Sequence, residues 1–91
     1  MALWNKNWAQ ISGTYTGTTD KNYKVKITNN SSFAFKWASK DIDSQTWSAW
    51  TDVTSVSLNT DYTLDNGIKV KFIRNTVGQY QVNDKWIWNV Y

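Results

Sequence analysis

The side chains that most often perform catalysis are absent from this sequence. Its 91 residues include no His and no Cys, and all seven acidic residues are Asp. Without imidazole or thiol, neither the usual neutral-pH acid–base group nor a Ser–His or Cys–His nucleophile pair can form. Metals that need thiolate or imidazole ligands are disfavoured for the same reason. We therefore expect a protein that is not an enzyme and that holds no metal or cofactor.

The acidic residues do not form a convincing cation site either. Asp41-Ile42-Asp43-Ser44 resembles the start of a calcium loop, but the glycine at its sixth position and the closing acidic residue are missing. The four glycines are scattered, so no Gly-rich phosphate loop is present. We interpret residues 41–44 as a solvated turn in which Asp side chains bond to nearby backbone.

Four Trp residues stand outside the regular alternation of apolar and polar residues. Trp4 and Trp8 share a face if their segment is helical, because they are four apart. Trp47 and Trp50 are three apart, so a regular strand directs them to opposite faces. Either these rings complete the edges of the core, or they form a contact surface for a protein or a sugar, since Trp is enriched at binding hot spots. The candidate partner-binding residues are Leu3, Trp4, Trp8, Trp47 and Trp50.

Lysines make up the second candidate surface. Lys24, Lys26, Lys36, Lys69 and Lys71 all alternate with apolar residues, and they form one basic patch if their strands share a sheet. They either keep strands soluble and block edge-to-edge pairing, or attract an acidic surface or phosphates. A single-strand binder needs aromatic rings among its basic residues, whereas the in-phase rings lie on the opposite face. We therefore do not expect nucleic acid as the partner.

The elements that position these residues are strands. Apolar and polar residues alternate with a period of two, and Thr, Val, Ile, Trp and Tyr outnumber helix-forming residues. The in-phase apolar residues are Tyr23, Val25 and Ile27; Phe33, Phe35 and Trp37; Ile68, Val70 and Phe72; Trp86, Trp88 and Val90. Strands are expected near 11–17, 21–29, 32–38, 46–50, 53–58, 61–64, 67–74, 79–82 and 84–90. We predict an all-β fold: a small antiparallel β-sandwich, immunoglobulin-like or barrel-like.

Turn residues divide the chain, and its length gives one domain. Asn29-Asn30-Ser31-Ser32 reads as a hairpin connection, and Asp65-Asn66-Gly67 as a tight turn that uses positive φ. We place the sandwich at residues 13–91 and a short N-terminal arm, with at most one helical turn, at residues 1–12. The net charge is +3, and no apolar run approaches the length of a membrane span, so we expect no membrane partner.

Three groups of segments together resemble a β-sandwich module of tailed-phage virion proteins and flagellar hook-associated proteins. The likeness covers roughly residues 13–88. Asn83 stands where the family usually has Gly, and Asn accepts the same left-handed turn; residues 39–43 lack the family's Gly-Gly. The segments are GTYTGTTD (13–20) leading to YKVKI (23–27); FKWASKD (35–41) followed by Thr46-Trp47; and NGIKVKF (66–72) followed by YQVNDKW (80–86).

The resemblance implies a structural role in a virus particle. In that family the module is usually part of a larger protein, whereas here about a dozen residues precede it, so we expect a free-standing product. It would decorate a capsid or sit on a tail or fibre, binding many copies of a larger virion protein after assembly in the host cytoplasm. Residues 3–8 would then be an anchor that orders on docking.

A carbohydrate-binding module is the alternative expectation. In that case Trp47, Trp50 or Trp4 would form a stacking platform for a surface polysaccharide, with nearby Asp or Asn side chains bonding the sugar hydroxyls. Both expectations describe a protein that works by binding.

Overall fold

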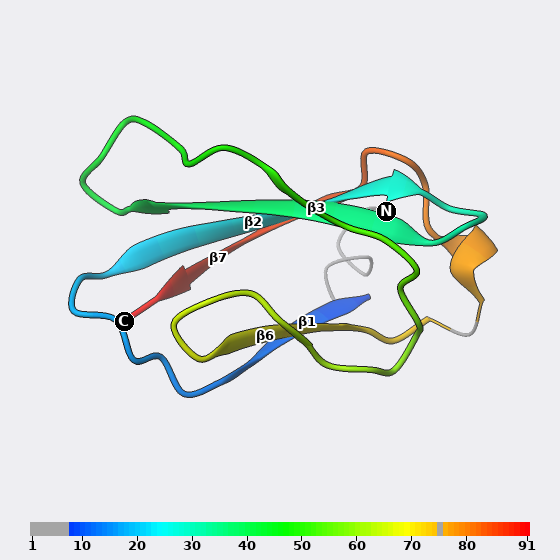
Figure 1. The fold of residues 1–91 in the computed structure, drawn as a ribbon, viewed down its shortest axis with the longest axis horizontal. Coiled ribbons are helices and arrows are strands. Elements are labelled where there is room, and N and C mark those ends of the chain that lie inside the picture. The colour runs from blue at the N-terminus through cyan, green and yellow to red at the C-terminus, as the bar shows by residue number, and fades with distance from the viewer. Residues whose placement is uncertain (1–7, 75) are drawn as a thin grey trace.

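The computed structural model describes residues 8–74 and 76–91, and these form two antiparallel sheets packed face to face (Figure 1). The predicted β-sandwich is therefore confirmed. Strand order is β1-β6-β5 in the three-stranded sheet and β4-β3-β2-β7 in the four-stranded sheet. The elements are β1 (Ala9–Gly13), β2 (Lys21–Asn29), β3 (Ala34–Asp41), β4 (Thr51–Val53), β5 (Tyr62–Thr63), β6 (Ile68–Phe72), the short 3-10 helix η2 (Val77–Gln79) and β7 (Lys85–Val90).

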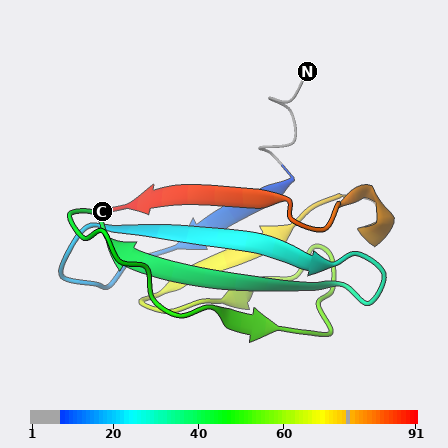
Figure 2. The ribbon, with the colours of Figure 1, turned by 90° about the horizontal axis from the view of Figure 1, so that it is seen from above.

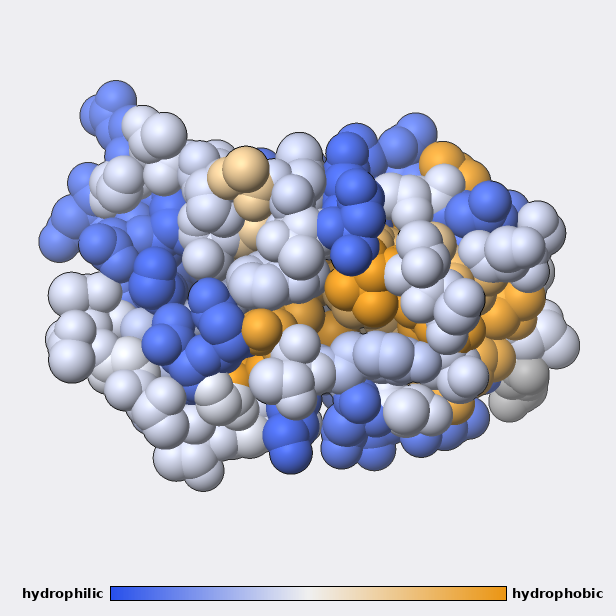
Figure 3. Space-filling model, viewed as in Figure 1, coloured by the Kyte–Doolittle hydropathy of each residue, from blue (hydrophilic) through white to orange (hydrophobic). Residues whose placement is uncertain are grey.

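Alternation decides which side chains enter the space between the sheets. On β2, Tyr23, Val25 and Ile27 are fully buried, while the lysines between them face outward. Strand β6 repeats the pattern, with its two lysines at positions 69 and 71. Figure 3 shows the result on one side of the molecule, where apolar atoms gather between the layers.

Phe72 of β6 is the centre of the core. Its ring centroid lies 5.1 Å from that of Phe35 and 5.3 Å from that of Phe33, both in the segment that forms the opposite layer. The rings of Tyr80 and Trp86 meet it at 5.8 and 6.0 Å, mostly edge to face. Such pairs add about 0.5–1.5 kcal/mol each beyond the burial of their area. The one aromatic ring of β6, in the smaller sheet, thereby contacts four rings from elsewhere in the chain.

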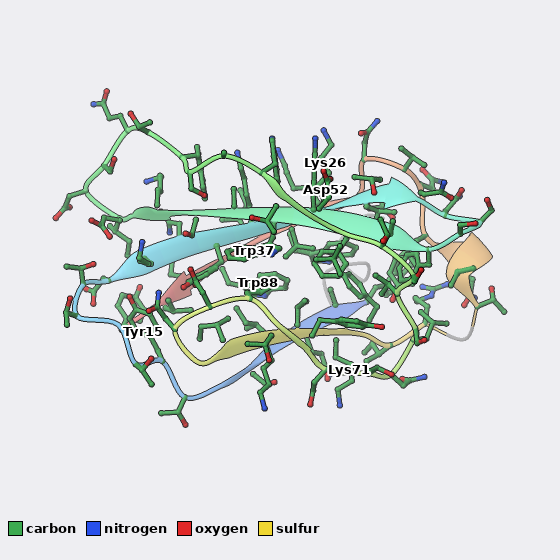
Figure 4. The ribbon with its side chains drawn as sticks, in the orientation of Figure 1. Tyr15, Lys26, Trp37, Asp52, Lys71 and Trp88 are labelled. Atoms are coloured by element: carbon green, nitrogen blue, oxygen red, sulfur yellow. The ribbon has the colours of Figure 1, made fainter. Side chains whose placement is uncertain are left out.

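Trp37 and Trp88 extend the core toward the open end of the sandwich. Both point between the layers (Figure 4), and both are partly buried against the core. Trp37 stacks on Tyr23 with ring centroids 6.1 Å apart. The in-phase aromatic residues thus form the core, as the alternation predicts.

Two buried tyrosines also join the layers through their hydroxyl groups. Tyr23 donates to the Asp65 carboxylate and accepts a hydrogen bond from the Asn66 amide at 3.3 Å. Burial, and then the neighbouring Asp65, raise the pKa of Tyr23. Because Tyr23 lies on β2 and Asp65 precedes β6, these contacts connect the two sheets.

Tyr80 makes the equivalent connection at the other end. Its hydroxyl donates to the Trp8 carbonyl at 2.6 Å and accepts from the Arg74 backbone N–H at 3.1 Å. Burial raises the pKa of this hydroxyl as well. The segment after η2 is therefore fixed to one end of the β1–β6 pair, where β1 begins and β6 ends.

The predicted turns are confirmed by their backbone geometry. Asn29 closes the β2–β3 hairpin with its side-chain oxygen, which accepts from the backbone N–H groups of Ser31 and Ser32. Asn66 and Gly67 have φ values of 49° and 81°, as two adjacent left-handed turn residues require. Asn83 has φ of 79°, which is the left-handed conformation that was expected for this residue.

The boundary between arm and sandwich was predicted too far along the chain. Strand β1 begins at Ala9 and pairs with β6 from Ala9↔Phe72 to Gly13↔Ile68, so residues 9–12 belong to the sheet. Ala9 is buried and Ile11 packs against the core, and these two side chains are a weak apolar signal for a strand. Residues 1–7 of the expected arm lie outside the described residues.

Two expected strands are absent from segments that the structure describes in full. Residues 46–50 form no strand, because the hydroxyls of Ser44 and Ser48 accept hydrogen bonds from the backbone N–H groups of Thr46 and Ser39. Residues 79–82 form no strand either, since the chain there leaves helix η2. Such local side-chain bonds replace the ladder bonds that a strand needs.

The close approach of Gly67 to the segment that follows β1 gives a first prediction. Replacing Gly67 by Ala places a Cβ atom 2.1 Å from the Thr14 carbonyl oxygen at a positive φ. We expect Gly67→Ala to lower the free energy of unfolding by at least about 2 kcal/mol. Gly78→Ala is the matched control, because nothing lies within 4 Å of its Cβ position. Urea unfolding measures both, and equal stabilities would contradict the expectation.

Candidate functional site

Lysines gather on the outer side of the four-stranded sheet. Pairing places Lys26 directly opposite both Lys36 on β3 and Lys85 on β7, so three like charges form one row. Lys24 lies two residues before Lys26 on the same side of β2. Among the paired residues of the described strands, Asp52 of β4, opposite Lys36, is the acidic residue in this row. Lys26 and Asp52 project from this side of the sheet in Figure 4.

This row is not neutralised by ion pairs. The described residues contain one ion pair, Lys21–Asp41 at 3.3 Å, which lies outside the row. Like charges directly opposite each other on neighbouring strands are destabilising. The row therefore lowers the stability of the free protein and presents a concentrated positive charge to solvent.

The loop between β3 and β4 brings two tryptophans to the same side. Residues 42–50 leave the end of β3 and rise above the outer side of the sheet (Figure 1). Ser48 ties the loop to β3, since its backbone N–H donates to the Ser39 carbonyl at 2.8 Å and its hydroxyl accepts from the Ser39 N–H at 3.0 Å. Trp47 and Trp50 on either side of this tie lie over the lysines.

Lys24 is the centre of these contacts. Its ammonium nitrogen lies 4.2 Å from the ring centroid of Trp47 and 4.5 Å from that of Trp50. Lys36 also lies over Trp50 at 4.6 Å, and Lys40 over Trp47 at 5.5 Å. At exposed sites each such cation–π contact stabilises by about 0.5–1 kcal/mol. We call Lys24, Lys26, Lys36, Lys40, Lys85, Trp47 and Trp50 the Lys–Trp face.

The electrostatics of the face favour an anion. Partial burial, followed by the positive charges of Lys85, Lys26 and Lys36, lowers the pKa of Lys24. The same neighbours that penalise its charge would attract negative groups of a partner. Trp50 is 37% exposed, so its ring is available to such a partner.

Lys40 has a second, structural function. Its ammonium group donates to the carbonyls of Ile42 at 3.2 Å and Ser44 at 2.9 Å, which closes the turn at the start of the loop. Hydrogen bonds from Thr19 and Lys21 lower the pKa of Asp41 beside this turn. Over residues 8–74 and 76–91, no three His, Cys, Asp or Glu residues form a group that could hold a metal ion.

Of the five candidate partner-binding residues, the structure describes three, and it separates Trp8 from Trp47 and Trp50. Trp47 and Trp50 come together on the Lys–Trp face. Trp8 instead packs at the end of the core, edge-on to Tyr80 at 6.0 Å and beneath the Arg74 guanidinium at 3.5 Å. The remaining two candidates, Leu3 and Trp4, lie outside the described residues.

The condition for a single basic patch is not met. The strands of the five lysines do not share a sheet, because Lys69 and Lys71 lie on β6 in the three-stranded sheet. Figure 4 shows Lys71 projecting away from the sandwich on the side opposite Lys26. The prediction that rings and lysines lie on opposite faces holds for the core aromatics but is wrong for Trp47 and Trp50. The geometric argument against nucleic acid therefore no longer applies.

Comparisons with protein-family models, with curated proteins and with solved structures find no match to this chain. Within the described residues, no helix has the length and apolar character needed to cross a membrane.

The charged row yields a second prediction. Replacing Lys26 by Gln removes repulsion on both sides of β2 and should raise the free energy of unfolding by about 0.2–1 kcal/mol at low salt. Salt should abolish the gain, because it screens exposed charges. Lys69→Gln is the control, since the cross-strand neighbours of Lys69 are the neutral Ser12 and Thr63. An unchanged or lower stability of Lys26→Gln at low salt would contradict this reading.

Proposed function

We propose that this protein is a non-enzymatic accessory subunit that binds a larger protein through its Lys–Trp face. The observation that carries the proposal is the placement of Trp47 and Trp50 on a row of lysines outside a rigid sheet. A protein that only needed solubility would gain nothing from concentrating like charges in one row. The arrangement is suited to a partner whose acidic groups neutralise the lysines.

The chemistry of the face fits a protein partner. Trp brings a large contact area at a low entropic cost, and it dominates many interface energies. Lysines around the rings would steer an acidic partner and increase the rate of association. Because cation–π contacts and Ser48 already hold the loop in place, little ordering is needed on binding.

The resemblance to phage modules supplies the biological setting of the proposal. We infer that the partner is a virion protein present in many copies, either of the capsid or of a tail or fibre. A small sandwich with one preformed face is suited to repeated attachment on such a lattice. The N-terminal anchor, now limited to the residues before β1, is a second proposed contact.

Loss of both rings tests the proposal. Trp47→Ala combined with Trp50→Ala should weaken attachment to particles purified from the source of this sequence at least about tenfold, as expected for hot-spot residues. Tyr91→Ala is the control, because Tyr91 is a highly exposed ring outside the Lys–Trp face. Co-sedimentation measures attachment, and thermal unfolding confirms that the variants fold. Attachment equal to that of the unaltered chain would refute this role of the face.

Binding of an acidic polysaccharide is a second candidate function. Two neighbouring tryptophans that both contact Lys24 provide a stacking surface beside positive charge. Saturable quenching of Trp fluorescence by an anionic polysaccharide, lost in Trp50→Ala and weak with a neutral one, is the expected result. A flat titration across a panel of anionic and neutral polysaccharides would remove this candidate.

A further inference from the structure

Strand β7 is one edge strand of the four-stranded sheet, and β4 is the other (Figure 2). At six residues it is the longest of the four edge strands, compared with five in β1, three in β4 and two in β5. Within the described part of the chain, β7 pairs only with β2. A long edge of this kind can accept another strand unless charge, proline or a covering segment prevents it.

The register shows which backbone groups of β7 are available. The backbone N–H of Ile27 donates to the Asp84 carbonyl and its carbonyl accepts from the Asn83 N–H, both at 2.9 Å, so both backbone groups of Ile27 point toward the segment that leads into β7. Hydrogen-bonded pairs alternate along an antiparallel ladder, so Trp86 and Trp88 also direct their N–H and C=O groups toward β2. The residues whose N–H and C=O groups point away from β2 are therefore Lys85, Ile87 and Asn89.

The side chains of these three residues form a short self-complementary pattern. Ile87 stands in the middle, and its large aliphatic side chain is 54% exposed. Lys85 precedes it and Asn89 follows it on the same side of the strand. Reversing the strand direction therefore brings a lysine opposite an asparagine and one isoleucine opposite another.

We propose that β7 pairs with β7 of a second copy of this chain, antiparallel, about a two-fold axis at Ile87. Ile87 then faces its counterpart, and Lys85 of each copy faces Asn89 of the other. Each of these pairs exchanges two backbone hydrogen bonds, so all the available groups of β7 are used. The result is a closed, symmetric dimer in which the two four-stranded sheets become one.

Other registers are less favourable. An axis at Lys85 would oppose two lysines and would leave Ile87 beyond the paired region. An axis at Asn89 would leave Lys85 and Ile87 without strand partners. The axis at Ile87 is the one that pairs the whole strand and also keeps the like charges apart.

A hollow in the sandwich next to β7 also favours a second copy of the chain as the partner of this edge. Between the β1 and β7 edges lies an open hollow lined by Ile11, Val90 and Tyr91. Ile11 and Val90 face the core yet remain partly exposed there. A second copy paired along β7 would bring its own β1 edge to this hollow and cover these side chains.

Sedimentation of the purified chain provides the first test. The unaltered protein should have the mass of two chains, and Ile87→Lys should raise the dissociation constant at least about tenfold by opposing two charges at the axis. Val82→Lys is the matched control, because Val82 is an exposed aliphatic residue outside β7. A single-chain mass for the unaltered protein would overturn the proposal. The proposal fails in the same way if residues 1–7 of the same chain cover the β7 edge, because that would also give a single-chain mass.

Single cysteines test the register, since the chain has none of its own. In a hydrogen-bonded antiparallel pair the Cα atoms lie about 5.5 Å apart, within the range that a disulfide spans. Ile87→Cys should therefore cross-link to itself on oxidation, and Lys85→Cys should cross-link only when mixed with Asn89→Cys. Self-linking of Lys85→Cys, or no link from Ile87→Cys, would overturn this register. Neither experiment involves the partner of the Lys–Trp face, so its outcome is independent of the proposed function.

Discussion

The packing of aromatic rings around Phe72 is the interaction on which the rest of the structure depends. The sequence provides no cysteine for a disulfide, and a domain of this size has a net stability of only about 5–10 kcal/mol. Phe72 contacts Phe33, Phe35, Tyr80 and Trp86, and therefore holds the three-stranded sheet against the other layer. The tyrosine hydroxyls fix the same two layers at both ends of the sandwich. Contacts inside the sandwich thus stabilise the fold, and the side chains on its outer surfaces are not needed for that stability.

The outer side of the four-stranded sheet carries side chains that lower the stability of the fold. A row of like charges on Lys26, Lys36 and Lys85 opposes folding, and a stable core can offset that cost. Local departures from the most stable arrangement are common where a surface is shaped for binding. Trp47 and Trp50 strengthen this reading, because their rings are held on the charged side of the sheet instead of in the core.

Much of the fold could be predicted from local pattern. Alternation identified β2, β3, β6 and β7, turn chemistry identified the left-handed residue Asn66, and the resemblance to phage modules indicated a left-handed turn at Asn83. The Lys–Trp face was harder to predict, because alternation assigns a residue to one side of a strand but does not say which sheet the strand joins. Lys71 was therefore grouped with Lys26, although the two lie on opposite outer surfaces. The meeting of Trp47 with Lys24 depends on the path of an irregular loop, which hydroxyl–backbone bonds determine and strand periodicity does not describe.

The contacts of Lys24 have a consequence for how the molecule can be observed. One ammonium group is shared by two indole rings, so the charge beside each ring depends on where that ammonium lies. A negative group arriving from outside competes for the same ammonium, and any movement of the lysine changes the surroundings of both indoles. The emission of Trp47 and Trp50 is then an intrinsic optical signal of occupancy at this surface. The other described tryptophans, which pack against or within the core, supply a steadier background.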